Sequence, residues 1–337
     1  MNIIIPMAGM GKRMRPHTLT IPKPLIPVGG KPIVQRLVED ITKVCGEKVD
    51  EIAFIIGPTF GKEVEKSLLE IAAKEGAKGS IYYQEQALGT AHAIYCAEPA
   101  LKGKTVVAFA DTLFKADFVM DTNNDGVIWV QKIEDPRQFG VVKMNQDGTI
   151  TDFVEKPQQF ISDLAIIGIY YFKDGEYLKK EIKYLLDNDI KDKGEYQLTN
   201  ALENMKAKGT KFVPGKVTEW LDCGNKDATV YTNQRVLEFD NGKNFLRAPS
   251  AKIENSQITE PCFIGENVTI VDSRIGPHVS IGAGTKIDNS TVKNSIIQQN
   301  AKITSSEIIN SMIGNSTEVH ALHGDLNLGD FSIVKKA

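Results

Sequence analysis

The sequence has few of the features that mark secreted, membrane-bound or nucleic-acid-binding proteins. Its four cysteines, Cys45, Cys96, Cys223 and Cys262, show no CxxC spacing, which is typical of free thiols in a reducing compartment. No apolar run approaches the roughly 20 residues that a membrane-spanning helix needs, and no charged leader precedes the first apolar residues. A formal net charge of −3 gives no reason to expect a nucleic-acid partner. We therefore expect a cytoplasmic protein with no membrane and no nucleic-acid partner.

The order of strand-like and helix-like segments predicts an α/β fold in the first part of the chain. At 337 residues the chain exceeds the usual size of one domain. Apolar strand-like runs at 51–57 and 105–111, with a helix-like run at 62–74, predict βαβ units and a mostly parallel sheet. Closer strand-like stretches predict an antiparallel addition that covers a substrate. They lie at 126–133, 139–144, 149–154 and 164–172, and later helices are expected at 174–187, 196–208 and 225–239.

A different pattern begins near Pro249, where apolar residues start to recur at intervals of 17. Three hexapeptide-type steps less one residue give such a coil, and the pattern resembles the left-handed parallel β-helix. We therefore predict an α/β domain over 1–240 and a short left-handed β-helix over 250–337. Its tail from His320 is expected to form a cap or to cross to a neighbouring subunit, and exposed coil faces predict a homo-oligomer. The series are Ile253, Ile270 and Ile287; Ile258, Ile275, Val292 and Ile309; Ile264 and Ile281; and Val279, Ile296 and Ile313.

A glycine-rich loop follows the first apolar run, Asn2–Ile5, which is typical of a buried parallel strand. Gly9 and Gly11 allow the backbone to turn sharply and to approach a charged group closely. Backbone amides and the cations after Gly11 then point at one small volume, which suits a polyphosphate. The spacing is neither a P-loop nor GxGxxG. Ala8, Gly9 and Gly11 are the candidate nucleotide-binding residues here.

The segments Gly9-x-Gly11-x-Arg13-Met14-x-Pro16, Pro22-Lys23-Pro24-Leu25 and Lys31-Pro32-Ile33 resemble the signature of the sugar-1-phosphate nucleotidylyltransferases. The resemblance covers residues 2–240 through at least six ordered motifs. Two departures are Ala8-Gly9 in place of Gly-Gly, and Lys12 in place of threonine. The resemblance implies a Rossmann-like mixed-sheet domain of the GT-A type. It also implies in-line attack of a sugar phosphate oxygen on the α-phosphorus of a nucleotide, with pyrophosphate as the leaving group.

The resemblance also implies catalytic cations and metal ligands. Arg13 is expected to grip the leaving pyrophosphate, since a planar guanidinium pairs bidentately with phosphate oxygens. Lys23 is expected to reach the α-phosphate in the transition state. Asp111, at the end of the strand-like run 105–110, and Asp222, in a Trp-Leu-Asp-x-Gly setting, are implied to hold Mg²⁺. This ion takes one or two carboxylates together with phosphate oxygens and water.

Further motifs imply the sugar and base contacts. In Glu155-Lys156-Pro157 the family uses the lysine for the sugar phosphate and the glutamate for sugar hydroxyls, and Gly140 is expected to offer its amide to the sugar. Gln84 and Gly89 have the spacing at which the family reads a pyrimidine edge, because an amide offers both a donor and an acceptor. A match at 194–199 carries no assigned role.

These motifs predict a Mg²⁺-dependent sugar-1-phosphate nucleotidylyltransferase. We favour dTTP or UTP as the nucleoside triphosphate and glucose 1-phosphate as the sugar 1-phosphate, which makes a glucose-1-phosphate thymidylyltransferase the leading prediction. A mannose-1-phosphate guanylyltransferase and a non-catalytic regulatory subunit of the same fold are alternatives. A β-helix acyltransferase is a third, disfavoured because only His278 lies inside the predicted stack. His92 is expected to pack or cap a helix rather than act as a base.

Overall fold

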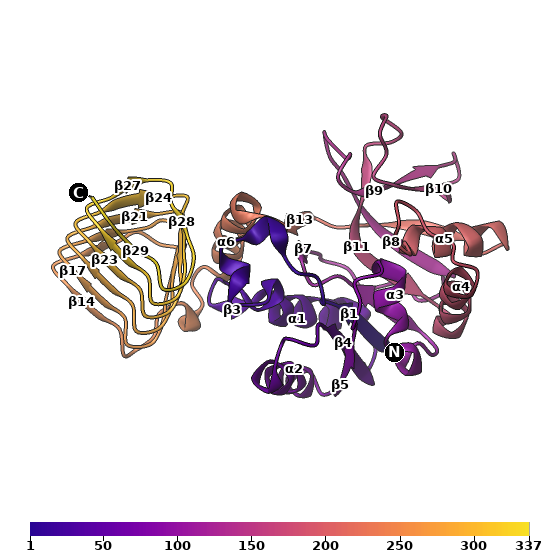
Figure 1. The fold of residues 1–337 in the computed structure, drawn as a ribbon, viewed down its shortest axis with the longest axis horizontal. Coiled ribbons are helices and arrows are strands. Elements are labelled where there is room, and N and C mark those ends of the chain that lie inside the picture. The colour runs from indigo at the N-terminus through magenta and orange to yellow at the C-terminus, as the bar shows by residue number, and fades with distance from the viewer. Residues whose placement is uncertain (337) are drawn as a thin grey trace. The chain divides into compact units, whose positions relative to one another are not determined.

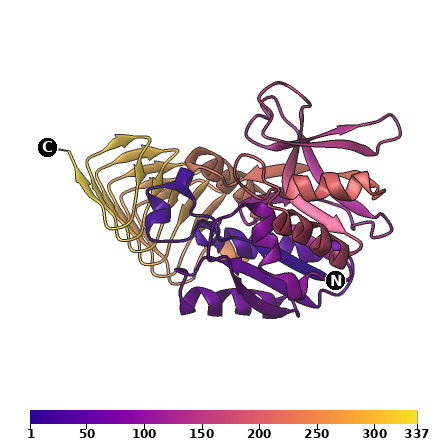
Figure 2. The same ribbon diagram turned by 45° about the vertical axis from the view of Figure 1, so that its right-hand side comes forward.

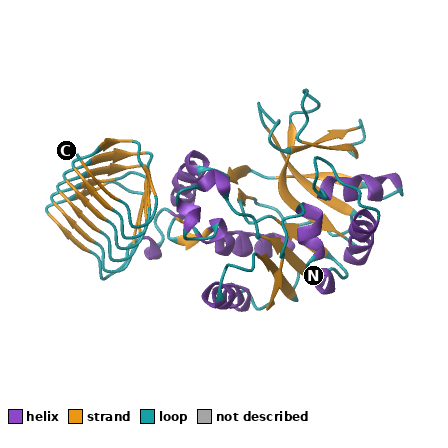
Figure 3. Cartoon of the chain, viewed as in Figure 1, coloured by secondary structure: helices purple, strands orange, loops and turns teal. Residues whose placement is uncertain are grey.

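Two compact units make up the part of the chain that the computed structural model describes, which is residues 1–336 without the side chain of Phe245. The first unit consists of Met1–Gly9 and Gln35–Trp220, and the second of Met10–Val34 and Leu221–Ala337. Figure 3 shows that the helices accompany the mixed sheet while the C-terminal stack is built of strands and turns. None of the helices in 1–336 combines the length and apolar character needed to cross a membrane.

A nine-stranded mixed sheet forms the centre of the first unit (Figure 1). Its strands are β1 (Asn2–Pro6), β4 (Glu51–Ile56), β5 (Lys78–Tyr83), β6 (Thr105–Ala108), β8 (Gly126–Lys132), β9 (Gly140–Met144), β10 (Ile150–Glu155), β11 (Leu164–Phe172) and β12 (Phe212–Lys216). The order is β10-β9-β11-β6-β1-β4-β5, with β8 on β11 and β12 on β8. β6, β1, β4 and β5 are parallel, whereas β11 runs antiparallel to β6, β8 and β9. The predicted parallel sheet with an antiparallel addition is confirmed.

Apolar runs and helix caps explain these elements. Ile3, Ile4 and Ile5 of β1 are wholly buried, as expected for a parallel strand that is covered on both faces. Asp174 caps one helix by accepting the N–H of Tyr177 at 2.9 Å. The helices of this part of the chain are α1 (Ile33–Cys45), α2 (Lys62–Lys74), α3 (Thr90–Tyr95), α4 (Gly175–Asp187) and α5 (Leu198–Ala207). α2, α4 and α5 confirm the predicted helices to within two residues.

The second unit begins with short elements and one long helix. Met10–Val34 contains the 3-10 helices η1 (Lys12–Met14), η2 (His17–Leu19) and η3 (Lys23–Leu25) and the hairpin β2 (Pro27–Val28) and β3 (Lys31–Pro32). The helix α6 (Lys226–Asp240) is capped by Asn225, whose side chain accepts the N–H of Ala228 at 3.0 Å. The strands β7 (Thr112–Lys115) and β13 (Glu219–Asp222) form a separate two-stranded sheet.

Three parallel sheets then stack around one apolar core, which is the arrangement of a left-handed β-helix (Figure 2). Residues 323–335 pair in parallel with the preceding coil of the same chain, so the tail continues the stack. The first sheet contains β14 (Lys252–Glu254), β17 (Thr269–Val271), β20 (Lys286–Asp288), β23 (Lys302–Thr304), β26 (Glu318–His320) and β29 (Ile333–Lys335). The second contains β15 (Gln257–Ile258), β18 (Arg274–Ile275), β21 (Thr291–Lys293), β24 (Glu307–Ile309) and β27 (His323–Gly324). The third contains β16 (Cys262–Ile264), β19 (Val279–Ile281), β22 (Ser295–Ile297), β25 (Met312–Ile313) and β28 (Asn327–Leu328).

The repeat shortens along the β-helix, so part of the predicted register is wrong. Ile253, Ile270 and Ile287 pair 17 residues apart as predicted, but Ile287 then pairs with Ile303, which is 16 residues on. Ile309 is displaced from the predicted inward series and is 44% exposed. In its place Val292 pairs with Ile308, and Val279 pairs with Ser295 instead of Ile296.

The corner between the second and third sheets causes the change. Ile275 and Ile281 are six residues apart, and the chain passes through Pro277 between them. The next coil makes the same passage from Val292 to Ile297 in five residues, without a proline. The loss of one corner residue moves every later inward position back by one, which a fixed 17-residue period does not predict.

Candidate active site

The predicted site residues are divided between the two units. The glycine loop itself is divided, because the first unit ends its first segment at Gly9 and the second begins at Met10. The first unit contains Ala8, Gly9, Gln84, Gly89, Asp111, Gly140, Glu155 and Lys156, and the second contains Gly11, Arg13, Lys23 and Asp222.

Asp111 lies in a turn at the carboxyl end of β6. Thr112 donates its N–H to the carbonyl of Phe109 at 3.3 Å, which closes the turn. β6 ends at Ala108 because the chain turns there, so the strand is shorter than the predicted run 105–110. The side chain of Asp111 therefore projects from the turn and not from the strand itself.

The start of the glycine loop lies at the same edge of the sheet. Ala110 donates its N–H to the carbonyl of Pro6 at 3.4 Å, and Pro6 is the last residue of β1. Ala8 and Gly9 follow at once, and Gly9 is exposed. Because β1 and β6 are adjacent and parallel, Ala8, Gly9 and the turn of Asp111 meet where open α/β sheets bind ligands.

A buried tyrosine connects two of the predicted carboxylates electrostatically. Burial raises the pKa of Tyr170, and the negative charges of Glu155 and Asp111 raise it further. The ring packs edge-on against Phe109 with centroids 6.1 Å apart. The Tyr170 hydroxyl therefore stays protonated, as a neutral group in the field of a metal-site carboxylate and a sugar-site carboxylate.

The amide of Gln84 is already engaged inside the first unit. Its Nε2 donates to the carbonyl of Gly89 at 3.2 Å and lies 3.1 Å from Nδ1 of His92. A backbone carbonyl only accepts, so it fixes the orientation of the amide, and Nδ1 of His92 must accept the second N–H. Burial lowers the pKa of His92, which favours this neutral ring. His92 thus positions Gln84, and Oε1 is the side-chain atom of Gln84 with capacity left for a base.

Gly89 is held by the motif at 194–199, whose role the sequence did not reveal. Tyr196 donates its N–H to Leu88 and accepts the N–H of Ala91, both at 2.9 Å. Gly89 has φ +115°, and a Cβ there would lie 2.5 Å from the carbonyl oxygen of Tyr196. No side chain fits this position, so the close approach of the two segments requires glycine.

Gly140, Glu155 and Lys156 lie together on the antiparallel part of the sheet. A Cβ at Gly140 would lie 3.1 Å from Oε2 of Glu155, so only glycine leaves room beside this carboxylate. The ammonium of Lys156 lies 3.5 Å from Oε1 of Glu155 and its side chain is 52% exposed. Lys193 donates to the carbonyls of Glu155 and Lys156 at 3.0 and 2.9 Å, which secures the turn.

Two buried donors beside this group were not predicted. The hydroxyl of Thr199 and the indole N–H of Trp220 have no hydrogen-bond partner among the described residues. The methyl group of Thr199 lies 3.6 Å from a Cβ placed at Gly140, and the Trp220 ring packs edge-on against Phe139 at 4.9 Å. Buried polar atoms without a partner are costly and often await a ligand. Both belong to motifs visible in the sequence, but their lack of partners depends on packing.

In the second unit, Gly11 brings the two halves of the signature together. It has φ +57°, a left-handed conformation that favours glycine. A Cβ there would lie 2.9 Å from the methyl of Thr18 and 3.2 Å from Cβ of Lys23. Thr18 donates its hydroxyl to the carbonyl of Gly11 at 2.8 Å. Lys23 is thus held directly beside the glycine turn.

Arg13 and Asp222 meet at Gly224. A Cβ at Gly224 would lie 3.0 Å from Nη2 of Arg13 and 3.0 Å from Oδ1 of Asp222. Gly224 donates its N–H to Oδ1 of Asp222 at 3.0 Å, which orients the carboxylate. The second unit therefore places a guanidinium and a carboxylate on either side of one glycine.

The donor set fits Mg²⁺ and does not fit a transition metal. Asp111 and Asp222 supply hard carboxylate oxygens, and no group of three His, Cys, Asp or Glu gathers anywhere in 1–336. Zinc sites draw three or four protein ligands, commonly nitrogen or sulfur, whereas Mg²⁺ binds through one or two carboxylates and completes its shell with substrate phosphates and water.

The fold and these residues define a nucleotide-handling α/β protein, and the comparison with protein families gives the class. Residues 2–238 match the family model described as nucleotidyl transferase, which spans more than half of the chain. The chain belongs to this family.

Curated relatives extend over nearly the whole chain. The glucose-1-phosphate thymidylyltransferase of Streptomyces antibioticus is 28% identical over 99% of this chain and 99% of its own length. The bifunctional protein GlmU of Methanococcus vannielii is 29% identical over 94% of this chain and 78% of its own length. A solved UDP-glucose pyrophosphorylase complexed with UDP-glucose has a TM-score of 0.58 at 22% identity, over 71% of this chain and 98% of that chain. This last likeness shows the fold.

Proposed function

We propose that this chain, as a sugar-1-phosphate nucleotidyltransferase, transfers a thymidylyl or uridylyl group from dTTP or UTP to glucose 1-phosphate and releases pyrophosphate. Family membership supports the class of reaction, and the relative from Streptomyces antibioticus supports the substrate pair. The observation that carries the proposal is the loop of the second unit, where Gly11 packs on Lys23 and Gly224 adjoins both Arg13 and Asp222. Cations and a carboxylate around a glycine turn suit a nucleoside triphosphate with its metal.

The proposed reaction is an in-line displacement at the α-phosphorus. An oxygen of the sugar phosphate attacks, the bond from phosphorus to the bridging oxygen breaks, and that oxygen's electron pair leaves with pyrophosphate. Lys23 neutralises the α-phosphate and Arg13 binds the leaving group. Asp111 and Asp222 are the residues that would hold Mg²⁺, which neutralises phosphate charge when bound. The chain contributes alignment and charge rather than a covalent intermediate.

The proposed sugar contacts are Gly140, Glu155 and Lys156. Because the ammonium of Lys156 is half exposed and its partner Glu155 is 3.5 Å away, it can take a phosphate as a further partner. The unpartnered hydroxyl of Thr199 and indole N–H of Trp220 are proposed as additional sugar contacts. Each would regain a hydrogen bond that the protein alone does not supply.

A guanylyltransferase is a second candidate, and one observation favours it. Both N–H groups of Gln84 are directed at protein acceptors, so the amide offers a base only Oε1. An acceptor pairs with the N3–H of thymine or uracil, and equally with the N1–H of guanine. Ala8, Gly9, Gly11 and Gly89 complete the proposed nucleotide site.

The test is pyrophosphate release with Mg²⁺ over a grid of five nucleoside triphosphates and the 1-phosphates of glucose, mannose, galactose and N-acetylglucosamine. We expect release with dTTP or UTP and glucose 1-phosphate, and its loss in Lys23→Ala and Asp111→Asn and after chelation of the metal. Lys66→Ala and Asp288→Asn, which change exposed residues on α2 and β20, are the matched controls. No release in any cell from a folded protein would refute the proposal and favour a regulatory subunit.

We also propose that the chain forms a homo-oligomer and that 1–240 and 250–337 are its domains. Ile333, on the last strand of the β-helix, is 72% exposed, and β29 ends its sheet. Light scattering coupled to size exclusion tests the oligomer, and a monomer at all concentrations would contradict it.

A further inference from the structure

The turn that follows Arg13 lies against the C-terminal end of the β-helix, residues 310–330, within the second unit. Nε2 of His17 lies 2.8 Å from Oδ1 of Asn327, and Thr20 donates its hydroxyl to Oδ2 of Asp330 at 2.8 Å. The partners are three residues apart on both sides. A 3-10 helix such as η2 places residues i and i+3 on one side, so the two bonds dock a single face of the turn.

This contact is closely packed. His17 is 1% exposed, and its Nδ1 has no hydrogen-bond partner in 1–336. A Cβ at Gly329 would lie 2.9 Å from Cβ of Pro16, so a side chain there would displace the turn. The carboxylate of Asp330 also accepts the backbone N–H and the side-chain amide of Asn315, at 2.8 and 3.0 Å. Asp330 is thus fixed to the β-helix before it accepts a hydrogen bond from the turn.

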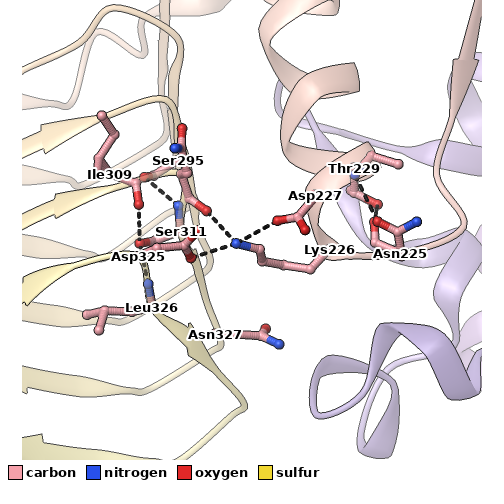
Figure 4. Close-up of polar contacts among 12 residues, drawn as sticks. Asn225, Lys226, Asp227, Thr229, Ser295, Ile309, Ser311, Asp325, Leu326 and Asn327 are labelled. Carbon is pink, nitrogen blue, oxygen red and sulfur yellow. Dashed lines mark hydrogen bonds and ion pairs between the residues drawn. The ribbon is translucent and has the colours of Figure 1, made fainter.

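A second tether holds the segment that carries Asp222. Lys226, the first residue of α6, donates to Oδ1 of Asp325 at 2.6 Å and to the carbonyl of Asn310 at 2.9 Å. Figure 4 shows the side chain of Lys226 extending from the start of α6 to the strands of the β-helix. The side chain is 14% exposed, and charge-assisted hydrogen bonds of this length are stronger than neutral ones.

We propose that residues 310–330 of the β-helix position the nucleotide-handling segments of their own chain, with Asn327, Asp330 and Asp325 as positioning residues. The inference rests on the proposed function, because it assigns a role in catalysis to two tethered segments. One tether fixes the turn between Arg13 and Lys23, and the other fixes the start of α6 after Asp222. The β-helix is then part of the catalytic scaffold and not only a module for oligomerisation.

The physical reason is the conformational entropy of a glycine loop. A loop that contains Gly9 and Gly11 has more backbone freedom than one built from other residues. Catalysis by alignment requires that freedom to be removed before the substrate binds. Two hydrogen bonds to a rigid stack remove it without contacting the substrate.

The test compares variants that remove one tether with matched controls elsewhere on the β-helix. Asn327→Leu and Thr20→Val each delete one bond while keeping side-chain volume. Gln257→Leu and Thr291→Val make the same chemical changes on early coils, away from the turn. Asn327→Asp keeps an acceptor for His17 and serves as the conservative variant. The readouts are amide hydrogen exchange of residues 11–25 in the substrate-free protein, kcat and KM in the pyrophosphate assay, and the melting temperature.

We expect faster exchange in 11–25 and a five- to tenfold lower kcat/KM in Asn327→Leu and Thr20→Val, about 1–1.4 kcal/mol. Asn327→Asp should stay within about twofold of the wild type, and the controls should match the wild type in every readout. Unchanged exchange in both tether variants would overturn the proposal whether or not the enzyme is active. Faster exchange with unchanged kcat/KM would also overturn it. A wild type inactive over the whole grid would refute the proposed function, and exchange alone would then decide whether the coil holds the loop.

Discussion

Substitution of Gln84 tests how the base is read, because the structure leaves this side chain one free acceptor. Gln84→Met keeps the length and removes the amide, so Gly89 loses a donor to its carbonyl and His92 loses one to Nδ1. Each lost intramolecular bond costs about 1 kcal/mol net, and the lost bond to the base costs about as much again. We expect kcat/KM for the nucleotide to fall by about 30- to 150-fold, the equivalent of about 2–3 kcal/mol.

Two companion variants separate positioning from contact with the base. His92→Phe removes only the acceptor that holds one N–H of Gln84, so we expect about a fivefold rise in KM and an unchanged kcat, from about 1 kcal/mol. Gln86→Met makes the same change two residues away on an exposed side chain and should have no effect. Steady-state kinetics of pyrophosphate release measures all three.

A methylated nucleotide completes the assay. If Oε1 of Gln84 accepts N3–H, UTP or dTTP methylated at N3 should be used more than tenfold less well by the wild type. Gln84→Met should not distinguish the methylated from the unmethylated nucleotide; for a guanine enzyme, N1-methyl-GTP takes the same part. Equal use of both nucleotides by the wild type would refute the assignment of Oε1. Loss of kcat in His92→Phe would instead make His92 a catalytic group.

Three further predictions concern the loop, the core and pH. Gly11→Ala should raise the KM for the nucleotide and lower the melting temperature, because a left-handed alanine costs about 1–2 kcal/mol and its Cβ would lie 2.9 Å from the methyl of Thr18. Phe212→Ala should cost about 3–5 kcal/mol of unfolding free energy in urea, since the ring is wholly buried, whereas Phe331→Ala should cost under about 0.5 kcal/mol. Burial lowers the pKa of His17 from its ordinary 6.5, so the neutral ring stabilises the fold above pH 6.5 and this stability is lost as pH falls toward the lowered pKa. The melting temperature should therefore fall more steeply from pH 6.5 to about pH 5 in the wild type than in His17→Gln.

Local patterns in the sequence were sufficient for the elements and for the strand ends that carry ligand-binding residues. β1 and β4 could be predicted because buried parallel strands are continuously apolar. Asp111 could be placed because it follows such a run by position alone. The 17-residue series predicted the β-helix, but the lost corner residue after Val292 left no hydrophobic signal of its own, so Ile309 was placed inward.

Contacts between distant segments could not be predicted. Gln84 looked like a two-way reader of a pyrimidine, because its chemistry alone offers a donor and an acceptor. Its donors are taken by Gly89 and His92, which depends on how α3 begins. His17 and Asn327 are 310 residues apart, and neither belongs to a motif or a periodic series. Their pairing follows from packing within the second unit.

The small polar pairs of the β-helix show how a repeated sequence feature becomes rigidity. In Asn255-Ser256 and Asp272-Ser273 the first residue has a positive φ, which asparagine and aspartate tolerate. The serine hydroxyl then accepts the N–H of the serine in the next coil. This bond recurs at 2.9, 3.0, 3.0 and 3.1 Å from Ser273 to Leu322.

Each serine hydroxyl in this series also donates to the carbonyl two residues before it. The ladder therefore satisfies a corner N–H in every coil and leaves no free donor to loosen the stack. It ends at Leu322, three residues before Asp325 and five before Asn327, the first residues that tether α6 and the signature turn. A rigid stack is what such a tether needs, because a hydrogen bond fixes a loop only as firmly as the group that accepts it is itself held.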